Sequence, residues 1–366
     1  VERIEVILGP GSALYGSGAF TAIVNAFTKN AGNGVRADLY ASTSGPKHLS
    51  ISYGYQSENT KVSIAASTHD SDGDQLDFEY PSGRPPQYVE RHGVSDGFNT
   101  VEDNKFSAKL LHNDWSLSMQ LSDSKIVWPN SSYYTDFNSH DNYLKISNIS
   151  FQAKTDFSVH DKFDSMLRFY YNDNKTIWHG VYEELPFLTP SGNQNWRYGG
   201  SYYGSEYQLL YSASNNFSLI SGLEITNNNE LFSVDSKTDF TQISLYSAVD
   251  YRLSDKLALN LGARIEKYSF RDTNEFIPKV ALIYKPSTST ALKIIYGRAF
   301  LAPSAWELQV AELVGNNDLK PELFDSTEFI FIKTYEKSSI NLSIFGSETT
   351  DAREILDTGD ADTSFV

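Results

Sequence analysis

The sequence contains no cysteine, which excludes disulfide-stapled scaffolds and thiolate metal centres and is compatible with an oxidising compartment. It has no apolar run near the roughly 18 residues that a membrane helix needs, so any bilayer crossing would have to use barrel strands. Basic residues are few: 30 Lys and Arg stand against 46 Asp and Glu, and the net charge of −16 argues against a nucleic-acid partner. Catalytic signatures are also missing, since no Gly-x-Ser-x-Gly elbow, phosphate loop or His-Glu-x-x-His segment occurs, and we predict neither an enzyme nor a cofactor.

Aromatic residues are abundant in this chain of 366 residues. They reach 14%, with 23 Tyr and 22 Phe, a content that suits the interfacial girdles of a membrane barrel. The hydrophobic fraction of 40% and the mean hydropathy of −0.39 would alone suggest a soluble protein. Barrel strands alternate apolar and polar residues, however, and such strands are hidden in a hydropathy average. Composition therefore leaves two all-β architectures open, a membrane barrel and a soluble lectin-like sandwich.

Two-residue alternation of apolar and polar side chains recurs along the chain and predicts about fifteen β-strands. The clearest examples are residues 115–122, 257–266 and 340–345. In the second of these, Leu259 and Leu261 point to one side of the strand while Asn260 and Arg264 point to the other. Such faces suit one apolar and one wet environment.

The connections between these strands fall into two alternating kinds. Short polar turns are predicted at 57–59, 113–114, 160–162, 214–216, 254–256, 286–290 and 336–337. Longer segments are predicted at 69–104, 123–143, 172–204, 227–239 and 299–323, with a helical pattern at 304–313. Tight turns at one end of a sheet and long loops at the other are typical of bacterial outer-membrane barrels.

The first thirty residues carry a dense motif, VERIEVILGPGSALYGSGAFTAIVNAFTK, that predicts a strand, a glycine-rich turn and a second strand. The run resembles the end of the plug domain of TonB-dependent outer-membrane receptors. There a Val-Glu-Arg-Ile-Glu-Val strand leads to Gly-Pro, Leu-Tyr-Gly and a final strand. Leu8 stands where an arginine is usual. The matching turn positions are Gly9, Pro10, Gly11, Tyr15 and Gly16.

A second segment, residues 296–322, is similar to a barrel signature of the same family, Phe-Arg-Ala-Pro-Ser followed by Gly-Asn-Pro-x-Leu-Lys-Pro-Glu. Leu301 and Asn317 replace the arginine and the first proline of that signature. The matching positions are Arg298, Phe300, Ala302, Pro303, Glu307, Leu319, Pro321 and Glu322. The resemblance implies that residues 1–30 end a plug domain and that residues 31–366 form about fifteen strands of a 22-stranded transmembrane barrel. It also implies that most of the plug, its TonB-binding segment and the last strands belong to a longer protein.

Aromatic residues in the long segments are the candidate ligand-binding groups. Trp128, Trp178, Trp196 and Tyr198 could stack a planar or apolar ligand, or they could sit in the outer interfacial girdle. In some receptors of the family the tyrosine of the Leu-Tyr-Gly turn faces the ligand, which makes Tyr15 a further candidate. The alternative for Tyr15 is a side chain that packs the plug against the barrel wall.

Metal sites are weakly indicated. Asp70, Asp72 and Asp74 resemble the opening of a calcium loop, but Gln75 and Pro81 stand where an EF-hand has its glycine and closing glutamate, which favours a solvated acidic loop. The seven histidines are scattered, and several of them fall in predicted loops. No histidine lies between residues 300 and 319, where haem receptors of the family carry one, so haem is not the expected cargo.

By resemblance, the function is TonB-dependent import of a scarce ligand, an iron–siderophore complex being the base-rate expectation. The implied partners are the TonB energy-coupling protein, outer-membrane lipid and a small-molecule metal chelate, and the implied location is the outer membrane of a Gram-negative bacterium. Two alternatives remain at this point: an outer-membrane barrel that senses a ligand or adheres without transport, and a barrel hydrolase. Cobalamin, other chelates and oligosaccharides are the other possible cargoes.

Overall fold

A computed structural model describes residues 2–28, 32–42, 45–78, 93–128, 135–182, 192–232, 236–270, 273–304, 307–308, 311, 319–353, 355–357 and 363–365. Strands dominate these residues. The one helix assigned as an element among them is α1 (Ser12–Tyr15). None of the described helical residues forms a helix that is long and apolar enough to cross a membrane.

Fifteen antiparallel strands form one large sheet, the number that the alternation predicted. In chain order they are β3 (Gly34–Ala41), β4 (Lys47–Gln56), β5 (Thr60–Ser71), β8 (Thr100–His112), β9 (Trp115–Val127), β10 (Tyr143–His160), β11 (Phe163–Tyr182), β12 (Gly192–Ser214), β13 (Phe217–Phe232), β14 (Ser236–Ser254), β15 (Leu257–Tyr268), β16 (Asn274–Ser287), β17 (Thr290–Leu301), β18 (Glu322–Thr334) and β19 (Ser339–Thr350). Each strand pairs with its neighbours along the chain, except that a small hairpin of β6 (Asp74–Phe78) and β7 (Gly93–Phe98) is inserted between β5 and β8. A further pair, β20 (Ile355–Asp357) and β21 (Thr363–Phe365), follows the sheet.

All seven predicted tight turns are present, and all join strands at the same end of the sheet. They connect β4 to β5, β8 to β9, β10 to β11, β12 to β13, β14 to β15, β16 to β17 and β18 to β19. The turn between β8 and β9 has only two residues, and Asn113 adopts φ 48°, a left-handed conformation that asparagine tolerates. The alternation of turn lengths along the sequence therefore identified the two ends of the sheet.

Three of the predicted long loops are wrong, because most of their residues are strand. The segment 69–104 contains the end of β5, the β6–β7 hairpin and the start of β8. β11 and β12 continue through much of 172–204, and β13 and β14 continue through much of 227–239. These strand ends are rich in Asn, Ser, Gly and Tyr, a composition that the sequence presents as loop. Antiparallel pairing satisfies their backbone groups whatever the side chains, so the ladder runs past the apolar part of the sheet.

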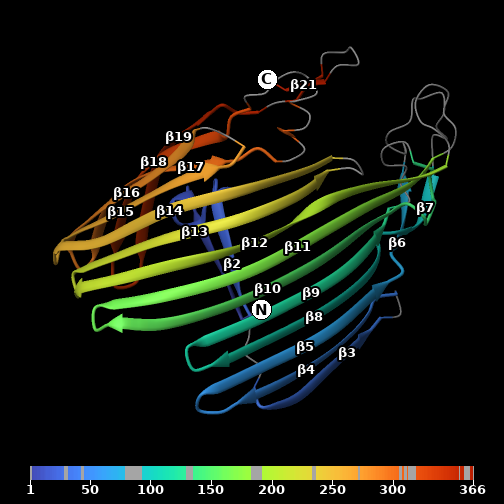
Figure 1. Ribbon diagram of the computed structural model, residues 1–366, viewed down its shortest axis with the longest axis horizontal. Coiled ribbons are helices and arrows are strands. Elements are labelled where there is room, and N and C mark those ends of the chain that lie inside the picture. Colours follow the sequence, from blue (N-terminus) through green and yellow to red (C-terminus); the bar gives the residue numbers. More distant parts are fainter. Residues whose placement is uncertain are drawn as a thin grey trace.

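The sheet is strongly curved, and the amino-terminal segment lies in its hollow (Figure 1). That segment is a hairpin of β1 (Arg3–Leu8) and β2 (Ala22–Phe27), with α1 at its tip. α1 contacts β14, β15, β16 and β17. Among the described residues, β3 and β19 each have one neighbouring strand, so the curved sheet is an open trough.

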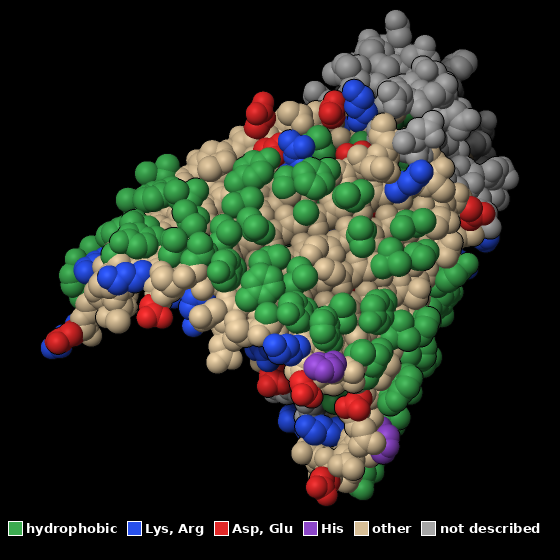
Figure 2. Space-filling view, turned by 60° about the vertical axis from the view of Figure 1, so that its left-hand side comes forward, with side chains coloured by type: hydrophobic (Ala, Val, Ile, Leu, Met, Phe, Trp, Pro, Cys, Tyr) green, Lys and Arg blue, Asp and Glu red, His purple; other side chains and the backbone are tan. Residues whose placement is uncertain are grey.

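The convex face of the sheet is apolar, and the concave face is polar. On β9, Trp115 and Met119 are exposed on the convex face, while Ser118 and Gln120 point to the concave face. Figure 2 shows a face covered by hydrophobic side chains, with Lys, Arg, Asp and Glu gathered along its margins. Near the tight turns, convex-face aromatics contact one another across strands: Phe163 stacks on Tyr211, and the chain of ring contacts continues through Phe217 to Tyr251. An apolar band edged by aromatics is what a lipid-facing barrel wall requires.

The two faces of β9 give a direct test of lipid contact. Met119→Arg places a charge in the middle of the apolar band, and we expect it to lower the free energy of unfolding from the bilayer by about 2–4 kcal/mol. Gln120→Arg, one residue along on the concave face, should cost less than about 1 kcal/mol, because that side chain stays in water. Urea titrations of the full-length protein in lipid vesicles measure both values. Equal costs for the two variants would contradict a lipid-facing convex side.

Candidate functional site: the amino-terminal turn and the concave wall

The glycine-rich motif forms a compact turn at the tip of the β1–β2 hairpin. The Gly11 N–H donates to the Ala19 carbonyl at 2.9 Å, and the Tyr15 N–H donates to the Gly11 carbonyl at 3.1 Å. Gly16, which ends α1, has φ 75°, a conformation that favours glycine. The backbone conformation of the turn therefore favours glycine at position 16, as the sequence predicts.

The turn is held against the sheet by backbone-directed hydrogen bonds to residues far away in the sequence. The Gly18 N–H donates to the Phe300 carbonyl at 3.3 Å, and the Ala302 N–H donates to Ser17 Oγ at 3.0 Å. Lys279 Nζ donates to the Pro10 carbonyl at 3.3 Å. These contacts join the first family motif to the second, because Phe300 and Ala302 belong to the segment that resembles the barrel signature.

A small apolar core lies under the turn. Ala13 is 2% exposed, and it clusters with Tyr268, Ile277 and Phe300, which are equally buried. The neighbouring Ser12 is fully buried, and its Oγ donates to the Ala19 carbonyl at 3.2 Å. The large buried residues of the described chain are thus concentrated where the turn meets the sheet.

Two glycines allow the turn to approach this closely. A Cβ atom on Gly297 of β17 would lie 2.8 Å from Cγ of Pro10, nearer than real Cβ contacts come. A Cβ atom on Gly16 would lie 3.2 Å from Nη2 of Arg264 on β15. One glycine on each side therefore sets the distance between turn and wall.

A chain of ion pairs crosses the concave wall beside the turn. Arg264 is 2% exposed; its Nε lies 2.5 Å from Glu266 Oε2 and its Nη2 lies 3.1 Å from Glu224 Oε2. Arg168 Nη2 lies 2.6 Å from Glu206 Oε2 and 3.4 Å from Glu224 Oε1. Three carboxylates and two guanidinium groups on β11, β12, β13 and β15 thus share their charges. Alternation along 257–266 predicts Arg264 and Glu266 on the same wet face, but the sequence gives no sign of the partners on β11, β12 and β13.

The second motif closes the connection between β17 and β18. Ser304 and Glu307 form a reciprocal cap, in which the Ser304 N–H donates to Glu307 Oε2 at 2.7 Å and the Glu307 N–H donates to Ser304 Oγ at 3.3 Å. Glu307 and Glu322 both bind the buried Arg353, whose Nε lies 3.0 Å and 3.8 Å from their carboxylates. Leu319, Pro321 and Pro303 are buried alongside. Residues 312–318 and most of the predicted helix at 304–313 lie outside the described residues, although residues 307–308 are helical.

Arg298, also part of the second motif, lies outside this cluster and forms an ion pair with Asp325. Its Nη2 lies 2.8 Å from Asp325 Oδ2, and Tyr296 Oη donates to Asp325 Oδ1 at 2.6 Å. The sequence named Arg298 but not Asp325 or Arg353. Neither partner has a local signal, because both are brought in from other strands or from beyond β19.

Three of the candidate aromatics come together on the concave wall at the end away from the tight turns. Trp178 on β11 lies directly opposite Trp196 on β12, and Tyr198 lies opposite Thr176, two residues along. Trp178 also contacts the buried Tyr182 edge-on, with ring centroids 6.2 Å apart. Trp196 is 45% exposed, so this aromatic wall, Trp178, Tyr182, Trp196 and Tyr198, has surface available for a ligand.

Trp128 and Tyr15 lie apart from the aromatic wall. Trp128 follows β9, and its backbone N–H donates to the Asn142 carbonyl at 2.9 Å. Tyr15 is 56% exposed on α1, whereas Ser12 and Ala13 of the same helix are buried against the sheet. The exposure of Tyr15 leaves its ring accessible in the hollow.

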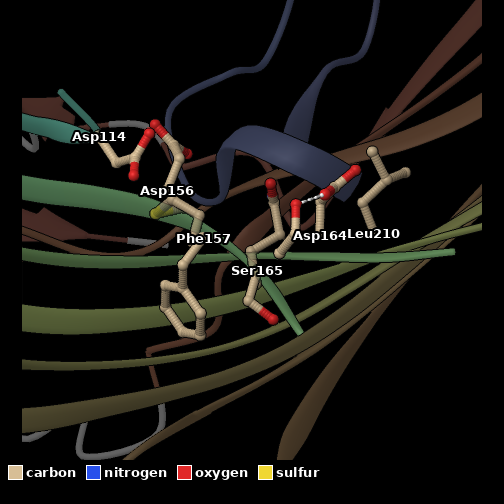
Figure 3. Close-up of a pocket in the computed structure, with 9 residues that line it drawn as sticks. Asp114, Asp156, Phe157, Asp164, Ser165 and Leu210 are labelled. Atoms are coloured by element: carbon tan, nitrogen blue, oxygen red, sulfur yellow. Dashed lines mark hydrogen bonds between the residues drawn. The ribbon is translucent and has the colours of Figure 1, made fainter. Parts of the chain in front are cut away.

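Acidic groups mark two further places. A pocket of about 460 Å³ at the tight-turn end is lined by Asp114, Asp156 and Asp164, and Ser158 Oγ donates to Asp164 Oδ1 at 2.5 Å (Figure 3).

The predicted calcium run, Asp70, Asp72 and Asp74, spans the end of β5 and the start of β6. Among the described residues no group of three or more His, Cys, Asp or Glu is placed to hold a metal ion.

Gly297→Val should loosen the turn from the sheet, because the new side chain occupies the space of the Pro10 ring. Overpacking of this kind costs about 1–3 kcal/mol, and the loss should appear as faster amide hydrogen exchange at residues 12–18. Gly346→Val on β19 is the matched control, since no atom lies within 4 Å of a Cβ built there. Unchanged exchange in Gly297→Val would mean that this contact does not set the docking distance.

Arg264→Met should leave Glu266 buried without its cation and leave Glu224 with only its longer contact to Arg168. Removal of one partner from a buried ion pair costs about 3–5 kcal/mol, and we expect a loss of that size in urea unfolding of the reconstituted protein. The double variant Arg264→Met with Glu266→Gln should recover part of the loss, because the uncompensated charge is then removed. A double variant no more stable than the single one would show that the pairing of charge is not what Arg264 provides.

Comparison with known proteins extends these observations. Residues 28–365 match the family model described as TonB dependent receptor-like, beta-barrel. The vitamin B12 transporter BtuB of Vibrio vulnificus is 26% identical over 191 residues, which make up 50% of this chain and 28% of that protein. A ferric enterobactin receptor of Pseudomonas aeruginosa is 35% identical over 87 residues, 21% of this chain and 12% of that protein.

A solved structure supports the same fold. The ferric enterobactin receptor PfeA of Pseudomonas aeruginosa, in a double-mutant form, superposes with a TM-score of 0.72 at 18% identity, covering 95% of this chain and 58% of that one. This chain therefore spans less than two thirds of the length of each of these proteins. The family is one of transporters rather than enzymes, and its barrel sits in the Gram-negative outer membrane. Because the family model covers nearly all of the fifteen-stranded sheet, this chain belongs to the TonB-dependent receptor family, as a part of its β-barrel.

Proposed function

We propose that this chain is part of a TonB-dependent receptor that imports a scarce ligand, an iron–siderophore complex first among the candidates. The observation that carries the proposal is the turn of residues 9–18, seated in the hollow of a receptor-family sheet with Tyr15 exposed. In this proposal residues 1–30 are the end of a plug, residues 31–366 belong to the barrel wall, and further strands of the longer protein complete a 22-stranded barrel.

A plug is physically necessary in such a barrel. A lumen of 22 strands is wide enough to leak, so it must be filled, and a tight binding site releases its cargo only when work is done on it. We propose that TonB supplies that work through a plug segment outside residues 1–366. The contacts of Pro10, Ser17 and Gly18 with β16, β17 and the residue that follows β17 are hydrogen bonds, which a pull on the plug could break and re-form more readily than a large apolar interface.

Cargo would bind between the plug turn and the aromatic wall. Aromatic faces and neutral hydrogen-bonding groups suit a ring-bearing chelate, and Asn148 and Asn174 are hydrogen-bonded to each other on the same wall below Trp178. Siderophores are favoured because the solved relative is named as a ferric enterobactin receptor, and a variant of it was solved in complex with enterobactin. The named relative BtuB makes cobalamin the second candidate cargo.

A sensor or adhesin that binds without transporting remains the second candidate function. Such a protein would have the same barrel and the same binding wall, so only energy coupling distinguishes it from a transporter. Uptake of a labelled ferric siderophore by cells that express the full-length protein should stop when TonB is deleted. Uptake that does not require TonB, or binding without uptake in TonB-containing cells, would contradict the import proposal.

Tyr15→Ala should weaken binding of the cargo while leaving the barrel folded. Loss of one aromatic contact is worth about 0.5–1.5 kcal/mol, or roughly a 2- to 12-fold rise in Kd. Titration of the purified full-length protein with the siderophore identified by uptake measures this, and heat-modifiable gel migration checks the barrel. Tyr335→Ala, a similarly exposed tyrosine at the tight-turn end, is the control and should leave Kd unchanged. An unchanged Kd in Tyr15→Ala would remove Tyr15 from the binding site.

A further inference from the structure

Two histidines separated by a tight turn in the sequence face each other on the concave wall. His48 lies on β4 and His69 on β5, and the strand register places them directly opposite one another. Their ring centroids are 6.1 Å apart, with an angle of 50° between the ring planes. Both are half-buried, and they point away from the lipid-facing side, on which Leu49 and Ile51 are exposed. The sequence predicts a loop at His69, but His69 lies within β5, and only the strand pairing brings it opposite His48.

The carboxylates beside this pair already have cationic partners. Asp103 of β8 lies opposite His69, and its Oδ2 is 2.5 Å from Lys105 Nζ. Asp38 of β3 lies near His48 and is bound by Arg36 at 2.8 Å. Of these neighbouring charged and titratable groups, the two imidazoles can therefore bind a new ligand without breaking an ion pair.

Two imidazoles at this separation suit a transition-metal ion. Metal–nitrogen bonds are about 2.0–2.1 Å long, so two rings can share one ion when their centroids are roughly 5–6 Å apart. Rotation of the side chains covers the small difference from 6.1 Å, with the backbone held by the β4–β5 ladder. Neutral imidazole suits Zn²⁺, Ni²⁺ and Cu²⁺, with Cu²⁺ the tightest of the divalent series.

We propose that His48 and His69 form a two-imidazole site for a divalent transition-metal ion on the concave wall. Two protein ligands leave coordination positions open. These positions would take water or the donor atoms of a chelating molecule, so the site would bind either a free ion or a metal complex with exchangeable positions. The site does not depend on siderophore import, since the pair lies on β4 and β5 while the plug turn packs on β14–β17.

Copper titration of the purified full-length protein in detergent, after removal of metal with EDTA, tests the site. Wild-type protein should bind one Cu²⁺ per chain at this site, with an electron paramagnetic resonance spectrum that shows coupling to two imidazole nitrogens. Loss of even an outer-shell partner costs 10–100-fold in metal affinity, so His48→Asn and His69→Asn should each weaken binding by roughly tenfold or more.

His112→Asn and His160→Asn are the matched controls, because these histidines lie at the tight-turn end of β8 and β10. Both should retain wild-type copper affinity and the two-nitrogen signal. Heat-modifiable migration confirms that each variant still forms the barrel. Wild-type affinity in His48→Asn and His69→Asn, or a spectrum without imidazole coupling, would overturn the proposal. Siderophore uptake measured on the same variants separates the two ideas, because failure of copper binding leaves TonB-dependent import standing.

Discussion

The structure depends on one constraint, that a chain facing hydrocarbon must pair every backbone N–H and C=O within the protein. A continuous antiparallel ladder from β3 to β19 meets that requirement, and tight turns keep consecutive strands adjacent. Because side chains alternate across such a ladder, each strand serves two environments at once. Lipid meets Trp115 and Met119 on the convex side, while Ser118 and Gln120 of the same strand line the hollow.

The polar concave wall creates a second requirement, because charges that are removed from water must be paired. The amino-terminal turn covers part of this wall, and there Arg264 is buried with carboxylates from β13 and β15 on either side. Gly16 and Gly297 let the turn come close enough to exclude water, and the apolar cluster around Ala13 and Phe300 fills what remains. Docking of the turn and burial of the ion pairs therefore depend on each other.

Much of the fold could be predicted from the sequence, because strands and tight turns depend on residues that are close together in the chain. The strand count, the seven tight turns and the two motifs follow from alternation, from Asn- and Asp-containing turns and from glycine positions that a turn requires. The lengths of the loops could not be predicted in the same way. β11 to β14 run on through residues such as Asn174 and Tyr202, which have no apolar alternation, because their pairing needs only a neighbouring strand.

The candidate site also has a part that the sequence predicts, the residue types, and a part that it does not, their arrangement. Residue types alone selected Tyr15, Trp178, Trp196 and Tyr198, since large aromatics in connecting segments are suited to binding. They could not show that the two tryptophans lie opposite each other while Tyr15 remains exposed on a helix whose other face is buried. Nor could they pair His48 with His69, or find that Arg353 holds Glu307 and Glu322 together.

The sequence by itself determined how many strands the sheet has, which side of each alternating strand is apolar, and where the chain turns sharply, because each of these depends on neighbours a few positions away. Only the tertiary structure decided which groups share the concave wall. Strand register brings Glu224 to Arg264 and His69 to His48, and docking brings Pro10 against Lys279 across 269 positions of the chain. Contacts of that separation arise from the curvature of the whole sheet around the amino-terminal segment, and no local pattern in the sequence records them.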